Sequence, residues 1–164
     1  MSRTLVLGGS RSGKSAFAES LLADAPAVTY LATGLADAAD AEWTARIAAH
    51  RARRPPHWST LETTDVAGVL RDAGDPVLVD SITLWVSAAL DEPDLDRRAG
   101  DLVAAWTTTT RRVVAVSDEV GSSVVPASAA GRRFRDALGR LNQRLAAAAD
   151  DVHLVVAGLP LRLK

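Results

Sequence analysis

Residues 8–15 read Gly8-Gly9-Ser10-Arg11-Ser12-Gly13-Lys14-Ser15, which matches the pattern G-x-x-x-x-G-K-[ST] in full. The motif follows a short apolar run at residues 4–7 and precedes a helical pattern at residues 15–22, so the sequence predicts a strand, a glycine-rich loop and a helix in direct succession. Glycines allow backbone N–H groups to wrap around phosphates, and the helix N-terminus adds favourable partial charge. We therefore interpret residues 8–15 as a nucleotide-binding P-loop rather than a structural turn that happens to contain Gly and Lys.

Lys14 is distinctive because lysine is almost absent from the rest of the chain. Of the 19 basic residues, only Lys14 and Lys164 are lysines. A compact ammonium fits among phosphate oxygens in a tight loop, where the larger planar guanidinium of arginine does not. We expect Lys14 to act as a catalytic group that neutralises the β- and γ-phosphate oxygens, and Ser15 to hold Mg²⁺.

The remaining pattern predicts an α/β fold. Strands are predicted at residues 27–33, 58–62, 76–80, 113–116 and 152–156, and helical patterns at residues 42–53, 65–72 and 129–149. Strands that are mostly apolar throughout and alternate with helices indicate a parallel sheet covered on both faces. Because no internal repeat or Pro/Ser-rich linker interrupts the chain, we expect one domain over residues 1–164, with a three-layer P-loop NTPase (RecA-like) fold.

Composition excludes several classes of function. The chain has no cysteine, which excludes thiol nucleophiles and Cys-type zinc sites. A formal net charge of −1 disfavours a nucleic-acid-binding domain. The first apolar run is too short for a signal-peptide core, and no stretch approaches the roughly 20 apolar residues of a membrane span. We expect a soluble, cytoplasmic protein with no nucleic-acid partner and no membrane span.

Carboxylates follow several of the predicted strands. A P-loop enzyme needs one to organise the metal, usually at the carboxyl end of a strand next to the first, and Asp80 is the candidate; alternatively, Asp80 caps a helix at residues 82–90. Glu62 could accept hydrogen bonds from a base or ribose, or be a surface carboxylate. Residues 118–121 lie where open α/β folds bind ligands, or form an ordinary turn.

His50 lies among four arginines, Arg46, Arg51, Arg53 and Arg54. On a helix, Arg46 and Arg53 share a face with His50. Nearby positive charge disfavours the imidazolium, and a neutral imidazole nitrogen is a nucleophile that could attack a nucleotide phosphate. A solvated basic helix with an incidental histidine explains the same residues equally well.

The two other histidines carry a different expectation. His57 stands next to Trp58, and His153 lies inside an apolar strand. We expect both to be packing residues.

Six segments together resemble the bifunctional adenosylcobinamide kinase/adenosylcobinamide-phosphate guanylyltransferase family of cobalamin biosynthesis. They are GGSRSGKS, YLATG, ARIAAHRARRP, PVLVDSITLWVS, SDEVGSSVVP and RRFRDALGRLNQRLAAAADDVHLVVAGLPLRLK. The resemblance spans nearly the whole chain. R-I-x-x-H followed by R-P, D-E-V-G with V-P, and the R-x-N-Q-R-L-A-A-A-A-D helix distinguish it from a generic P-loop kinase.

The resemblance implies phosphorylation of adenosylcobinamide, then transfer of GMP from GTP to adenosylcobinamide phosphate. It places His50 at the guanylylated histidine, and Ala49 before it leaves no neighbouring histidine to substitute. It implies Mg²⁺ as the cofactor and GTP and ATP as substrates. It also implies a corrinoid partner and a homotrimer. The nucleotide-binding residues that it implies are Gly8, Gly9, Ser10, Arg11, Ser12, Gly13, Lys14, Ser15, Thr33, Gly34, Leu35, Arg51, Ala52, Arg53, Arg54, Glu62 and Asp80.

The chain departs from the family pattern near the expected corrinoid site. The family commonly has Asn where this chain has Asp118, and Gly-containing residues where it has Ser122 and Ser123. A small-molecule kinase without a covalent nucleotidyl intermediate is the alternative function. A non-catalytic module gated by nucleotide is a further alternative, of a different class.

Overall fold

A single sheet forms the centre of the computed structural model, which describes residues 2–34 and 55–164. In these residues seven strands take the order β3-β2-β4-β5-β1-β6-β7, and all neighbouring pairs are parallel except β6 and β7. The strands are β1 (Arg3–Gly8), β2 (Val28–Ala32), β3 (Trp58–Glu62), β4 (Val77–Asp80), β5 (Val113–Asp118), β6 (Asp151–Val156) and β7 (Leu159–Arg162).

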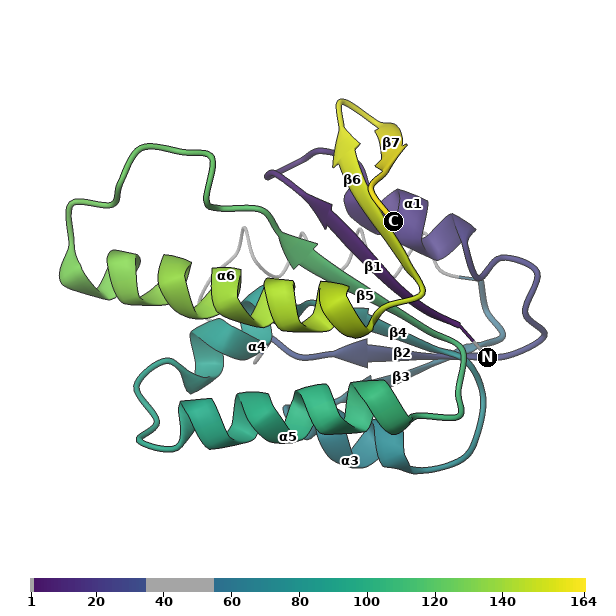
Figure 1. Ribbon diagram of the computed structural model, residues 1–164. Helices are drawn as coiled ribbons and strands as arrows, with labels where there is room; N and C mark the ends of the chain where they lie inside the picture. The colour runs from purple at the N-terminus through teal and green to yellow at the C-terminus, as the bar shows by residue number, and fades with distance from the viewer. Residues whose placement is uncertain (1, 35–54) are drawn as a thin grey trace.

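Helices cover both faces of the sheet (Figure 1). They are α1 (Lys14–Ser20), α3 (Val66–Arg71), α4 (Ile82–Ala89), α5 (Leu95–Thr108) and α6 (Ala129–Ala148). Side chains of α3, α4, α5 and α6 pack on one face, in a cluster that contains Leu5 and Val79. Helix α1 packs on the other face, in a cluster that contains Val6 and Leu78. Consecutive residues of one strand therefore enter opposite layers, which is why these strands are apolar throughout.

The three-layer, mostly parallel architecture predicted from the sequence is confirmed. Two elements were not predicted: helix α5, whose first turn contains Asp96, and strand β7, which contains Pro160. The helix expected at residues 42–53 lies outside the described residues. None of the described helices is both long and apolar enough to cross a membrane.

An ion pair fixes the amino-terminal end of β1 against the start of β6. The Arg3 guanidinium lies 2.9 Å from Oδ1 of Asp150, and the Arg3 backbone N–H donates to Oδ2 at 2.8 Å. These bonds to the charged carboxylate lower the pKa of Asp150 to about 2. Strands β1 and β6 are therefore joined at the end of the sheet opposite to the P-loop.

Candidate nucleotide-binding site

The P-loop connects the carboxyl end of β1 to the first residue of α1. Gly13 caps the helix with φ of 93°, a left-handed conformation that favours glycine. A Cβ built on Gly8 would lie 2.7 Å from the carbonyl oxygen of Val155 and also clash with the Ser12 hydroxyl. Both glycines are therefore needed for the backbone path of the loop.

Lys14 turns its ammonium back across the loop. Nζ donates to the carbonyl oxygen of Gly9 at 3.1 Å and lies 2.6 Å from Oδ1 of Asp118. Lys14 is only 9% exposed, so its charge is largely removed from water and requires these partners. The Lys14 ammonium is therefore held in place beside the loop by Gly9 and Asp118.

Asp118 is held firmly at the end of β5. Its N–H donates to Oγ1 of Thr83 at 2.7 Å, and its carbonyl oxygen accepts from Nδ2 of Asn142 at 3.1 Å. Strand β5 lies directly beside β1, with Asp118 paired to Gly8. Both interpretations that the sequence left open for residues 118–121 have a counterpart in the structure. Asp118 lies beside Lys14, and the Glu119 carboxylate accepts from the N–H groups of Gly121 and Ser122 in a turn.

Asp80 ends β4, but β4 is not next to β1 as expected from the sequence, because β5 lies between them. The alternative role of Asp80 as a helix cap is wrong, since Oγ of Ser81 accepts from the Leu84 N–H and caps α4. Asp80 instead accepts a hydrogen bond from the Tyr30 hydroxyl. The Asp80 carboxylate therefore does not cap α4.

Three carboxylates face the layer that contains α1. Asp80 and Asp118 stand two residues after Leu78 and Val116, which pack with α1, so they point to the same side. Glu62 is exposed and shares that side, because Ala32 pairs with both Glu62 and Asp80. The carboxyl edge of the sheet thus presents carboxylates on β5, β4 and β3 to the face that carries the P-loop helix.

Thr33 is buried and joins β2 to the start of α4. Its hydroxyl donates to the carbonyl oxygen of Ser81 at 2.6 Å and accepts from the Ser81 N–H at 3.0 Å. Gly34 follows it, whereas Leu35, His50, Arg51, Ala52, Arg53 and Arg54 lie outside the described residues.

The structure separates the other two histidines. His153 packs against Phe17 with ring centroids 5.1 Å apart, as expected for a packing residue. His57 is exposed, so its predicted packing role is wrong. It follows Pro56 in an exposed turn before β3.

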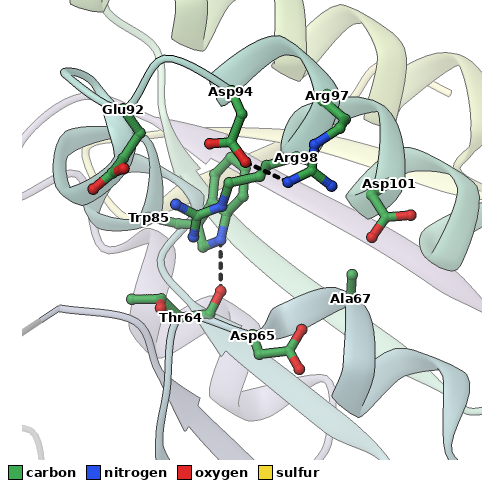
Figure 2. A pocket seen from close by; sticks show the side chains of 9 residues that line it. All are labelled: Thr64, Asp65, Ala67, Trp85, Glu92, Asp94, Arg97, Arg98 and Asp101. Carbon is green, nitrogen blue, oxygen red and sulfur yellow. Dashed lines mark hydrogen bonds and ion pairs between the residues drawn. The ribbon is translucent and has the colours of Figure 1, made fainter.

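A hollow of about 450 Å³ lies between α3, α4 and α5 (Figure 2). Arg98 lies over the Trp85 ring at 5.5 Å, and Trp85 Nε1 donates to the Thr64 carbonyl oxygen at 2.8 Å. Trp85 packs in the cluster on the face opposite to α1. This hollow therefore belongs to the other layer and is not part of the P-loop site.

Comparison with known proteins identifies the family. The family model described as "Cobinamide kinase / cobinamide phosphate guanyltransferase" matches residues 4–163. The chain belongs to this family. It is 45% identical to the bifunctional adenosylcobalamin biosynthesis protein CobP of Pseudomonas aeruginosa, over 99% of this chain and 97% of that protein. It is 41% identical to the corresponding CobU protein of Salmonella typhimurium, over 98% of each chain.

Solved structures of other families share the fold. An ATPase from the type III secretion system of pathogenic bacteria aligns with a TM-score of 0.60 and 13% identity, over 98% of this chain and 57% of that one. A KaiC-like protein of Pyrococcus horikoshii aligns with a TM-score of 0.51 and 14% identity, over 93% of this chain and 70% of that one. At this level of identity the likeness concerns the fold alone.

The Lys14–Asp118 pair predicts that the Asp118 carboxylate competes with nucleotide phosphates for the Lys14 ammonium. Asp118→Asn keeps the shape but removes a negative charge beside the expected phosphates. We expect it to tighten binding of metal-free ATP roughly fivefold at low salt, about 1 kcal/mol for a partly exposed pair, with a smaller effect at high salt. Isothermal titration calorimetry measures this.

Asp24→Asn is the matched control, because it removes the same charge from an exposed pair with Arg112 and should leave ATP binding unchanged. Unchanged or weaker binding of ATP by Asp118→Asn at low salt would contradict competition between Asp118 and phosphate.

Proposed function

We propose that this protein phosphorylates adenosylcobinamide and then transfers GMP from GTP to adenosylcobinamide phosphate. The products of the second step are adenosylcobinamide-GDP and pyrophosphate. Family membership over nearly the whole chain supports both activities. The site supports them because a buried lysine and carboxylates occupy one edge of the sheet.

The arrangement of these charged groups is the observation that carries the proposal. Moving outward from β1, the sheet presents Asp118 on β5, Asp80 on β4 and Glu62 on β3. With a strand spacing of about 4.8 Å, their strands lie about 5, 10 and 19 Å from the P-loop strand. If Lys14 binds the triphosphate, the nucleoside would lie along this row of carboxylates. Asp80 would then be near the phosphates and the metal, and Glu62 near the ribose or base.

Residues 8–15 bind the triphosphate in this proposal. Backbone N–H groups of the loop and the N-terminus of α1 face the phosphates. The Lys14 ammonium leaves Asp118 and contacts the β- and γ-phosphate oxygens. The Thr33 hydroxyl is occupied by Ser81, so Thr33, Gly34 and Leu35 contribute through their backbone. Residues 51–54 supply cations for the remaining phosphate oxygens.

Mg²⁺ fits this donor set. Ser15 and Asp80 offer the hard oxygen ligands that Mg²⁺ prefers, and Mg²⁺ usually keeps several waters and binds through one or two protein oxygens plus phosphates. When bound, Mg²⁺ neutralises charge that develops on the phosphates.

His50 is the nucleophile of the transferase step. A ring nitrogen attacks the α-phosphorus of GTP, the bond from that phosphorus to the bridging oxygen breaks, and pyrophosphate leaves. A phosphate oxygen of adenosylcobinamide phosphate then attacks the same phosphorus, the P–N bond breaks, and neutral His50 is restored. The arginines that the sequence predicts on the same helical face as His50 would favour the neutral ring that the first step requires.

The covalent step separates this enzyme from a plain P-loop kinase. Protein incubated with α-labelled GTP and Mg²⁺ should retain an acid-labile label after denaturation. His50→Ala should lose the label, whereas His57→Ala, an exposed histidine nearby in the sequence, should keep it. Label retained by His50→Ala would refute the assignment.

Phosphorylation of cobinamide with ATP or GTP tests the kinase step separately. If His50→Ala loses the label but still phosphorylates cobinamide, the kinase activity does not depend on the covalent step.

We further propose a cytoplasmic homotrimer. Its support in the structure is an apolar surface on the β6–β7 hairpin, where Val156, Leu159, Leu161 and Leu163 are each more than half exposed. Clustered exposed apolar side chains of this kind mark protein contacts.

Sedimentation equilibrium should give a mass three times the 17.2 kDa of one chain. The double substitution of Leu159 and Leu161 by Asp should shift that mass towards the monomer, because charges in an apolar contact are poorly solvated. A monomeric wild-type protein at micromolar concentration would contradict the trimer.

A further inference from the structure

The turn between β6 and β7 touches the P-loop on the side away from Asp118. Strand β6 lies beside β1, with Val155 paired to Gly8, and the chain reverses at Ala157 and Gly158 into β7. Ala157 and Gly158 have φ of 52° and 81°. Two consecutive positive φ angles in a two-residue loop are typical of a type I′ turn, whose geometry fixes where its N–H groups point.

This turn is bonded to the loop through the backbone. The Gly158 N–H donates to the carbonyl oxygen of Ser12 at 2.8 Å. The two chains also approach closely there, since a Cβ built on Gly13 would lie 3.1 Å from Cα of Gly158. The contact is therefore specific in both direction and distance.

The bond orients the next peptide group of the loop. In a planar trans peptide the carbonyl of Ser12 and the N–H of Gly13 point in opposite directions. Because the Ser12 carbonyl is held towards the hairpin, the Gly13 N–H is held on the opposite side of the peptide, away from the hairpin. A free loop could rotate this peptide and present a carbonyl oxygen to the phosphates instead.

We propose that the β6–β7 turn is a positioning element for nucleotide binding, in which Gly158 holds the Ser12–Gly13 peptide so that the Gly13 N–H meets the triphosphate. The inference rests on the proposed binding of a triphosphate by residues 8–15. Gly158 itself touches no substrate; it acts through the loop.

Gly158 allows a test that changes the backbone without a steric clash. No atom lies within 4 Å of a Cβ built there, so a side chain affects only the φ preference. Gly158→Val strongly disfavours positive φ and should displace the N–H, whereas Gly158→Asn tolerates it. We expect the Val variant to bind a fluorescent GTP analogue roughly ten- to a hundredfold more weakly, the effect of one misdirected hydrogen bond to a charged group. The Asn variant should bind within about twofold of the wild type, because its N–H stays in place.

Asp150→Asn controls for general destabilisation. It removes the negative charge that pairs with Arg3 at the opposite end of β6, which weakens those contacts, and should lower the melting temperature with the affinity unchanged. All affinities are measured well below the melting temperature of each variant. If Gly158→Val does not fold, Gly158→Ala takes its place, with an expected loss of about three- to tenfold because a Cβ disfavours positive φ less than a β-branched side chain does.

The outcomes separate the two proposals. If the wild type binds the analogue and the Val or Ala variant binds equally well, the positioning role is wrong and the proposed function stands. Equal losses in Asp150→Asn and the Gly158 variants would also overturn it, because the effect would then be one of stability. A wild type that binds no GTP analogue overturns both.

Discussion

A nearly buried ammonium at the mouth of the P-loop is the constraint on which the rest of the site depends. Lys14 is removed from water, so its charge must be met by an anion or by carbonyl oxygens. Asp118 and the Gly9 carbonyl meet it here. A triphosphate carries more negative charge than one carboxylate and can also accept from the loop N–H groups, so it can replace Asp118 without leaving the ammonium unpaired. In the proposed site the ammonium is therefore held in place by atoms of the chain itself.

The strand order explains how Lys14 and the P-loop are contacted from both neighbouring strands of β1. Strand β1 lies between β5, which ends in Asp118, and β6, which leads to the Ala157–Gly158 turn. One neighbour therefore supplies the partner of the lysine, and the other fixes the backbone of the loop from which that lysine projects. Because the strands are parallel, residues far apart in the sequence meet at a single edge, which is the general reason that open α/β sheets bind ligands there.

The sequence predicted the strand–loop–helix succession at residues 3–20 and strands β2 to β6 correctly, because a complete motif and uninterrupted apolar runs carry strong local signals. It did not predict β7, since Pro160 within a short Leu-rich stretch suggests a loop; the strand lies at an edge, where proline is tolerated. The pairing of Lys14 with Asp118 could not be read from local patterns, because it depends on the order of strands. Residue types favoured Asp80 as a metal ligand but left a helix cap open, and the hydrogen bond from the Leu84 N–H to Ser81 excludes only the cap.

The central claim is that Lys14 moves from Asp118 to a triphosphate bound by residues 8–15. A crystal structure with Mg²⁺ and a non-hydrolysable GTP analogue tests it most directly. The account predicts electron density for the β- and γ-phosphates inside the loop, with Nζ of Lys14 within hydrogen-bonding distance of their oxygens and no longer in contact with Asp118. A nucleotide bound elsewhere on the chain, with the Lys14–Asp118 pair intact, would contradict it.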